Sequence, residues 1–118
     1  MKIPGPDHPI TVEPEAARVS VHAGGRVLAD TTAALRLQEA DYPPVFYIPI
    51  DDVDRSLLRR SDTRTHCPYK GDASYYDLVT DDGTISDAMW TYEQPYDAVA
   101  QIAEHLAFYR DRVQVALD

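Results

Sequence analysis

The sequence predicts a mainly β domain (α+β class) of antiparallel strands with one principal helix near residues 96–105. Most of the chain divides into short runs in which apolar and polar residues alternate, the period-2 pattern of half-buried strands. Turn-forming residues, such as the pair Gly24 and Gly25, separate these runs. Only one segment has the 3.6-residue spacing of a helix, and its apolar positions are Val99, Ile102, Ala103 and Leu106.

The strands follow from this alternation in order along the chain. We expect them at Arg18–His22, Arg26–Asp30, Ala34–Gln38, Val45–Ile48, Ala73–Thr80, Ile85 or Asp87 to Tyr92, Ala107–Tyr109 and Arg112–Leu117. Two alternating runs joined by Gly-Gly predict a hairpin. A brief helical turn is expected over residues 52–58, and residues 64–70 lack a clear period, so we expect a loop or an irregular edge there.

The chain is expected to form one domain over residues 1–118. Residues 1–17 contain four prolines, which exclude a continuous helix or a central strand and predict an extended N-terminal arm. Residues 18–118 then form the β-rich core. With 118 residues, of which 44% are hydrophobic, the chain is long enough to build one core.

The charge balance narrows the classes of partner. Asp and Glu outnumber Lys and Arg 20 to 11, and the net charge of −9 repels nucleic acid and anionic lipid. The segment Met1–Pro9 is polar and does not resemble a signal peptide, and no apolar run is long enough to span a bilayer. The single cysteine fits a reducing compartment. We therefore expect a cytoplasmic protein that binds neither membranes nor nucleic acid in bulk.

One segment differs in charge from the rest of the chain. Between residues 59 and 70, four basic side chains accompany a single carboxylate, and several aromatic residues lie nearby. Arg and Lys bind phosphate or carboxylate, and aromatic faces stack on planar rings. This composition favours a pocket for a small anionic or ring-bearing molecule, such as a nucleotide. The predicted ligand-binding residues are Tyr47, Arg64, His66, Tyr69, Lys70, Trp90 and Tyr92.

Plainer interpretations of the same residues stay open. The arginines can be solvated, the tyrosines can be core residues, and Trp90 and Tyr92 share a strand face where large aromatics are usually buried. The candidate catalytic residues are His66, Cys67 and Lys70, since nearby positive charge lowers the pKa of a thiol. The alternative for Cys67 is an inert, buried thiol. The sequence leaves open whether Glu39 points into a pocket or into solvent.

No metal or cofactor site is expected. The four histidines are scattered, and no C-x-x-C or H-x-x-x-H pair supplies two ligands from one element. No glycine-rich phosphate loop is present either.

Several strings of residues carry a family resemblance. They are Asp7–Ile10, Ala29-Asp30, Leu37–Glu39, Pro44–Pro49, Ser61–Gly71, Ala88–Tyr92 and Ala107–Tyr109, with Thr65–Gly71 (Thr-His-Cys-Pro-Tyr-Lys-Gly) the most distinctive. Together they resemble the domain of unknown function 427 family, which has been labelled a nucleotidyltransferase family. The resemblance implies a compact fold of coiled antiparallel sheets and a transferase activity.

Two classes of function follow from these observations. The first is an enzyme or binding domain for a small anionic or nucleotide-like molecule. The alternative is a non-catalytic domain whose acidic surface and aromatic residues contact a protein partner.

Overall fold

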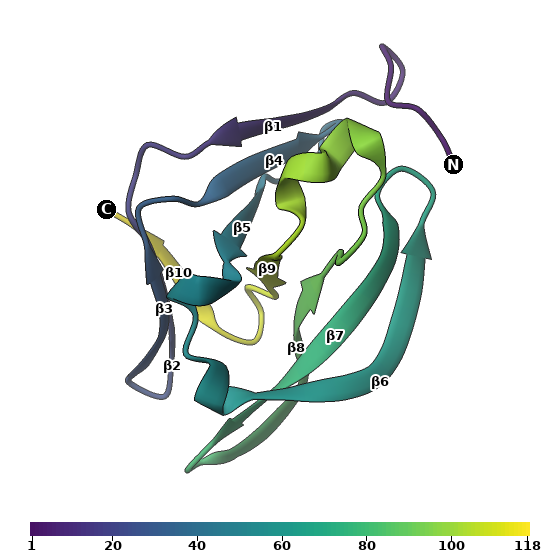
Figure 1. Ribbon diagram of the computed structural model, residues 1–118. Coiled ribbons are helices and arrows are strands. Elements are labelled where there is room, and N and C mark those ends of the chain that lie inside the picture. The colour runs from purple at the N-terminus through teal and green to yellow at the C-terminus, as the bar shows by residue number, and fades with distance from the viewer.

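Ten strands in two antiparallel sheets confirm the predicted mainly β fold. The structure, a computed structural model, describes residues 1–118. The strands are β1 (Ile10–Pro14), β2 (Val19–Ala23), β3 (Arg26–Thr31), β4 (Leu35–Glu39), β5 (Val45–Pro49), β6 (Leu58–Cys67), β7 (Gly71–Thr80), β8 (Gly83–Thr91), β9 (His105–Phe108) and β10 (Gln114–Leu117). Seven of them form a sheet in the order β1-β4-β5-β9-β8-β7-β6, and β10-β2-β3 form the second sheet (Figure 1).

Side chains that alternate along the strands divide the interior into two clusters. On β5, Phe46 and Ile48 belong to a cluster shared with the three-stranded sheet, which contributes Val19 and Val21. The intervening Tyr47 belongs to the second cluster, on the opposite face. The second cluster also contains Tyr75, Tyr92, Val99 and Ile102 and is covered by the helical segment that follows β8. The larger sheet is therefore buried on both faces near its centre.

The helix predicted near residues 96–105 is present as a short 3₁₀ helix, η3 (Asp97–Ile102). Val99 and Ile102 are buried, as their spacing indicated, but Val99 has the non-helical dihedral angles φ −128° and ψ 29°. Glu104 adopts a positive φ of 62°, and β9 begins at the next residue. The helix thus ends before residue 105, because the chain from His105 onward pairs as β9. The other helical segments are the 3₁₀ turns η1 (Ile50–Asp52) and η2 (Arg55–Leu57).

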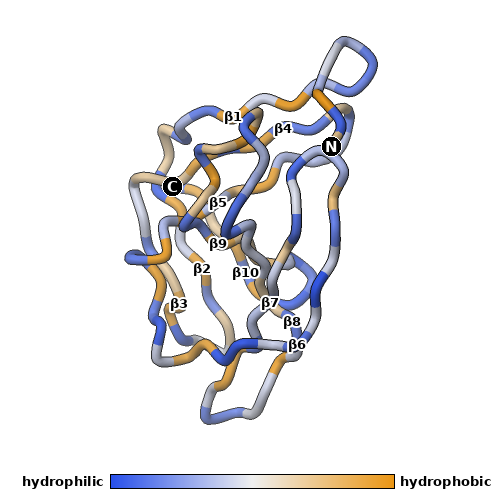
Figure 2. The backbone as a smooth tube through the Cα atoms, turned by 45° about the vertical axis from the view of Figure 1, so that its right-hand side comes forward, coloured by the Kyte–Doolittle hydropathy of each residue, from blue (hydrophilic) through white to orange (hydrophobic).

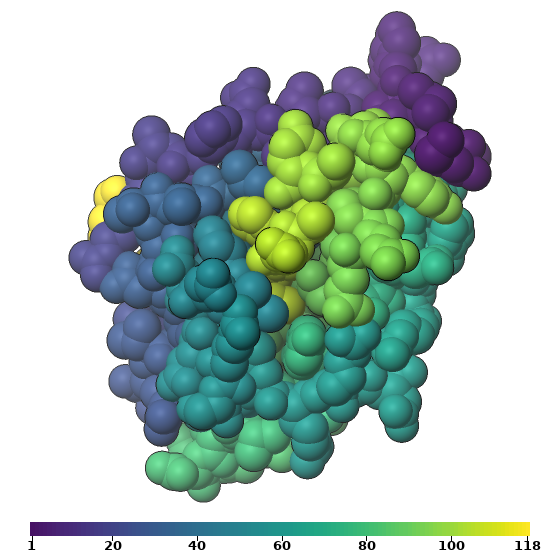
Figure 3. All heavy atoms as spheres, viewed as in Figure 1, coloured from purple at the N-terminus to yellow at the C-terminus, as the bar shows by residue number.

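The N-terminal arm contains an edge strand. β1 pairs with β4 over five residues, from Ile10 opposite Glu39 to Pro14 opposite Leu35. Its place at the sheet edge explains how the strand tolerates proline, which lacks the amide hydrogen that a central strand would need. Figure 3 shows the arm running across the top of the molecule, beside the segment that contains η3.

Of residues 64–70, which we expected in a loop or irregular edge, residues 64–67 belong to the edge strand β6 and residues 68–70 form the turn before β7. This strand is largely hydrophilic along its length (Figure 2), because only one of its edges and part of one face are covered. Because β6 has few apolar residues, the sequence there lacks the apolar–polar alternation that predicts a strand. A register shift between Arg60 and Arg64, and another in β7 between Tyr76 and Leu78, bend the long β6–β7–β8 ribbon around the core. The helical segments are all short, and none has the length and apolarity needed to traverse a bilayer.

Candidate functional site

The larger sheet opens at a seam between β5 and β9. These strands pair only at Ile48 opposite Leu106 and Pro49 opposite His105. β9 continues to pair with β8 as far as Phe108, opposite Met89, so β9 stays with β8 while β5 diverges. The strand pairing thus leaves a gap beside the first half of β5.

Trp90 of β8 bridges this seam. Its indole Nε1 donates a hydrogen bond to the hydroxyl of Tyr47, 3.3 Å away, and the two rings meet edge to face with centroids 6.4 Å apart. On its other side, the Tyr109 ring lies 4.5 Å from that of Trp90. These three rings form an aromatic wall across the gap.

Two cavities adjoin this wall, each with a volume of about 300 Å³. The aromatic cavity is lined by Leu37, Glu39, Tyr42, Pro43, Val45, Tyr47, Lys70, Tyr75, Trp90, Tyr92 and Tyr109. The apolar cavity is lined by Tyr42, Pro43, Pro44, Val45, Phe46, Ile48, Trp90, Phe108, Tyr109, Arg110 and Val115. They lie on opposite faces of β5, because Tyr47 lines the first while Phe46 and Ile48 line the second.

A half-buried ion pair lines the aromatic cavity. Glu39 is the last residue of β4, and Lys70 lies in the turn that precedes β7. The Lys70 ammonium donates to Glu39 Oε1 at 2.5 Å, and the side chains keep only 11% and 17% of their surface exposed, respectively. Lys70 Nζ also lies 6.0 Å from the centroid of the Tyr92 ring. The cavity therefore presents a cation and a carboxylate side by side among aromatic rings.

The N-terminal arm fixes the other side of this pair. His8 Nε2 lies 2.7 Å from Glu39 Oε2 and bonds to it, while the His8 ring stacks on Tyr69 with centroids 4.1 Å apart. The Lys2 amide donates to the Pro68 carbonyl at 2.7 Å. The arm thus holds the 68–70 turn against the end of β4, where Lys70 meets Glu39.

Electrostatics keep the polar groups of the cavity in defined protonation states. Burial raises the pKa of Glu39, but hydrogen bonds from Lys70 and His8 outweigh it and leave the pKa below its ordinary value. Burial raises the pKa of Tyr47 and of Tyr92 far above the ordinary value, and it raises the pKa of Tyr109 to about 12 with a contribution from Tyr75. At neutral pH, Glu39 is charged and these phenols are protonated.

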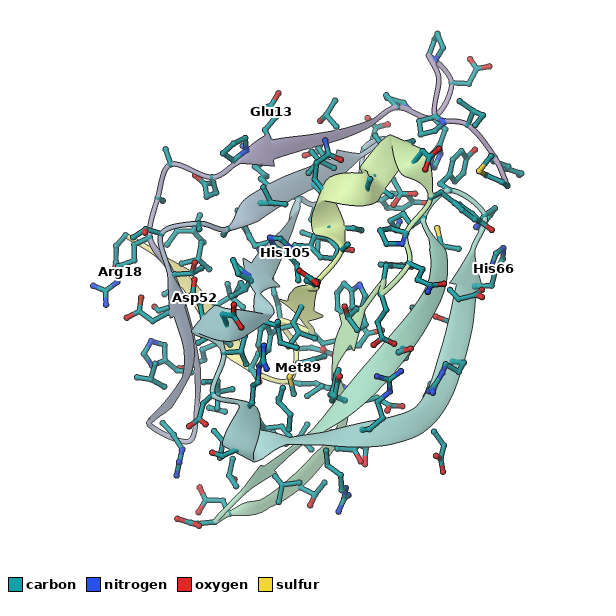
Figure 4. The ribbon with its side chains drawn as sticks, in the orientation of Figure 1. Glu13, Arg18, Asp52, His66, Met89 and His105 are labelled. Atoms are coloured by element: carbon teal, nitrogen blue, oxygen red, sulfur yellow. The ribbon has the colours of Figure 1, made fainter.

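The structure divides the seven predicted ligand-binding residues among three places. Tyr47, Lys70, Trp90 and Tyr92 converge on the aromatic cavity. Arg64 and His66 line a separate, wide polar groove of about 910 Å³ over β6 and β7. Tyr69 lines neither and packs on His8 instead. Figure 4 shows His66 at the outer side of the β6 end, away from the interior that holds Met89.

Two of the three arginines of β6 are matched by carboxylates from elsewhere in the chain. Arg59 pairs with Asp77 at 3.2 Å, and Arg60 pairs with Glu93 at 2.7 Å. Arg64 has no carboxylate partner and donates to the carbonyls of Ser61 and Thr63. The local excess of positive charge in the sequence is thus largely cancelled in space, where sheet neighbours come from distant positions.

The candidate catalytic residues His66 and Cys67 are not hydrogen-bonded to each other, and Lys70 pairs with Glu39. His66 Nδ1 lies 2.7 Å from Asp72 Oδ1 and bonds to it. Cys67 is half-buried against the second core cluster, and no hydrogen bond joins it to His66. No group of three or more His, Cys, Asp or Glu side chains is arranged to hold a metal ion.

Several lining residues were not among the predicted ligand-binding set. Glu39, whose direction the sequence left open, points into the aromatic cavity, and Tyr42, Tyr75 and Tyr109 complete its walls. Glu39 and Tyr109 lie in strings that carry the family resemblance, and the chain is rich in tyrosine, with eight residues, but the gap that gathers these side chains depends on long-range strand pairing. His8 was missed because its partner lies 31 positions away.

The comparison with protein families gives a match over nearly the whole chain. The model of the domain of unknown function DUF427, whose short name carries a nucleotidyltransferase label, matches residues 11–118. The chain belongs to the DUF427 family. The matched region includes both cavities and every predicted ligand-binding residue, while His8 lies just before it. No curated protein matches this DUF427 domain.

Proposed function

We propose that this DUF427 domain binds a small, planar, ring-bearing molecule of the size of a nucleobase or nucleoside in the aromatic cavity. The observation that carries the proposal is the half-buried Glu39–Lys70 pair in a cavity whose other walls are mostly aromatic and apolar. Ligand sites commonly combine apolar walls with a few convergent polar groups that orient the ligand.

The energetics of the ion pair support a role in recognition. Removing two charges from water costs several kcal/mol per ion, and a hydrophobic pair of similar volume often stabilises a fold equally well. Glu39 and Lys70 keep only 17% and 11% of their side-chain surface exposed, so both charges carry this desolvation cost. By this argument the two charges add little to the stability of the fold, whereas they supply hydrogen-bonding groups that a ligand can use.

The arrangement favours a ligand edge with adjacent hydrogen-bonding groups over a free anion. The charge of Lys70 is already balanced by Glu39, and the protein as a whole carries a charge of −9. Lys70 supplies donors and Glu39 supplies acceptors at neighbouring points, which complements the donor–acceptor edge of a nucleobase or cyclic amide. The rings of Trp90 and Tyr92 supply surfaces against which a planar ligand packs.

The test uses Trp90, the only tryptophan of the chain, as an intrinsic reporter of the wall that both cavities share, and the variants below assign the binding to the aromatic cavity. Nucleobases, nucleosides and nucleoside monophosphates are titrated separately while tryptophan emission and thermal stability are measured. We expect at least one base or nucleoside to change the emission saturably and raise the melting temperature. Inorganic phosphate alone is expected to do neither.

Two variants and one control assign that binding to the ion pair. Lys70→Met or Glu39→Gln should weaken it by about 10- to 100-fold, since a hydrogen bond to a charged group contributes about 1.5–3 kcal/mol. Arg64→Ala alters an exposed arginine of the polar groove and should leave the affinity unchanged. If no base or nucleoside binds, the proposal fails and the protein-interaction alternative gains support. If only Arg64→Ala weakens binding, the proposal also fails, because the ligand then binds in the polar groove.

A further inference from the structure

The apolar cavity on the other face of β5 has features of a second binding site. It lies where the first half of β5, the end of β9 and Val115 of β10 meet, so both sheets contribute to it. Eight of its eleven lining residues are hydrophobic. No carboxylate lines it, although the chain carries 20 acidic residues.

Arg110 is the only charged residue that lines this cavity. It follows β9 in the turn toward β10, and its guanidinium lies over the Phe46 ring, 5.2 Å from the centroid. Arg110 takes part in no ion pair or side-chain hydrogen bond, whereas most other arginines of the chain have an acidic or carbonyl partner. An unpaired guanidinium thus stands at the edge of an apolar space.

We propose that the apolar cavity binds a carboxylic acid with an apolar body, whose hydrocarbon part occupies the cavity while its carboxylate meets Arg110. Burial of the hydrocarbon part supplies most of the affinity. The guanidinium supplies the selection for an anion, because carboxylate and guanidinium form charge-assisted hydrogen bonds. The two cavities share five lining residues, but Arg110 lines only the apolar one.

The net charge of the protein makes the preference of the apolar cavity for an anion testable. A net charge of −9 attracts cations and repels anions, so nonspecific adsorption of an amphiphile favours the positively charged member of a series. A preference for the anion therefore requires a local positive group. Arg110 is the one lining residue that provides it.

The experiment compares octanoate, 1-octanol and octylammonium as probes by calorimetric titration of the full chain. We expect octanoate to bind about fivefold more tightly than octanol, because an exposed charge pair contributes up to about 1 kcal/mol. Octylammonium should bind most weakly of the three. Chemical shifts of the Ile48 and Val115 methyl groups should move on binding, which places the probe in this cavity.

Charge reversal supplies the decisive variants. Arg110→Glu should invert the order, so that octylammonium binds more tightly than octanoate. Arg64→Glu makes the same change of net charge at an exposed site outside the cavity and should keep the wild-type order.

Three outcomes would overturn the inference. They are equal or tighter binding of octanol or octylammonium by the wild-type protein, equal effects of Arg110→Glu and Arg64→Glu, and absence of saturable binding by any of the three probes.

Discussion

Replacing Lys70 by methionine should destabilise the domain through the charge that it leaves behind. Loss of one partner from a buried ion pair costs about 3–5 kcal/mol, because the remaining charge is uncompensated. Here Glu39 keeps 17% of its surface exposed and its bond to His8, so we expect about 2–3 kcal/mol. For a domain of this size that corresponds to a fall in melting temperature of roughly 8–12 °C.

The double variant Lys70→Met/Glu39→Leu should recover most of this loss. With both charges removed, only the partly exposed His8 ring loses a partner, and we expect a stability within about 1 kcal/mol of wild type. Urea unfolding followed by circular dichroism measures all four members of the cycle. If the losses of the two single variants simply add in the double variant, the two side chains are not coupled and the reasoning is refuted.

The pH dependence gives this prediction a second readout. In the wild type the pKa of Glu39 is lowered from its ordinary value of 4.5, so the stabilising contribution is present above that pH and is lost as pH falls through the folded-state pKa. In Lys70→Met, burial dominates and the pKa of Glu39 rises, so protonation relieves the buried charge. The stability gap between the two proteins should therefore narrow from pH 7 toward pH 5.

Two further predictions concern the backbone and the tyrosines around the cavity. Gly71 has a φ of +112°, and an added Cβ would lie 3.4 Å from the carbonyl oxygen of Gln94. Gly71→Ala should therefore lower the free energy of unfolding, measured by thermal denaturation, by about 2 kcal/mol. As a control, Gly5→Ala, with open space around the added Cβ, should change it by less than about 0.5 kcal/mol. In an alkaline titration followed by tyrosinate absorbance, Tyr109 should ionise near pH 12, and Tyr47 and Tyr92 later still. Because these pKa values are raised in the folded state, their stabilising contribution is complete below about pH 10 and declines above it; ionisation of all three near pH 10 in the folded protein would contradict the burial argument.

Local patterns were sufficient to predict most of the strands. The apolar run Val45–Ile48 predicted a strand, and the structure places Phe46, Tyr47 and Ile48 alternately in the two core clusters. The Gly24-Gly25 pair predicted the hairpin between β2 and β3, where both glycines have positive φ. These features depend on side-chain period and on backbone sterics, which a sequence displays directly.

The arrangement of the site depends on contacts between distant residues. The charge run of β6 predicted a field that attracts anions, but Arg59 and Arg60 pair with Asp77 and Glu93, which lie 18 and 33 positions away. Likewise, the alternation of β5 predicts its two faces and not the point at which it diverges from β9. Strand pairing determines both the charge balance of β6 and the divergence of β5. The sequence therefore indicated four lining residues of the aromatic cavity but left open the direction of Glu39, the carboxylate partner of Lys70.

The Glu39–Lys70 pair links the stability of the domain to the proposed binding of a ligand. If the apolar double variant is nearly as stable as the wild type, the Glu39–Lys70 pair is not retained for the fold, since methionine and leucine would serve the core equally well. That result would favour a role for the pair in binding a molecule outside the fold. The only neighbours left to it are His8, the aromatic rings and the space of the cavity, and of these only the space can hold a variable partner. A double variant that folds normally but no longer binds a base or nucleoside would separate the two roles within one protein.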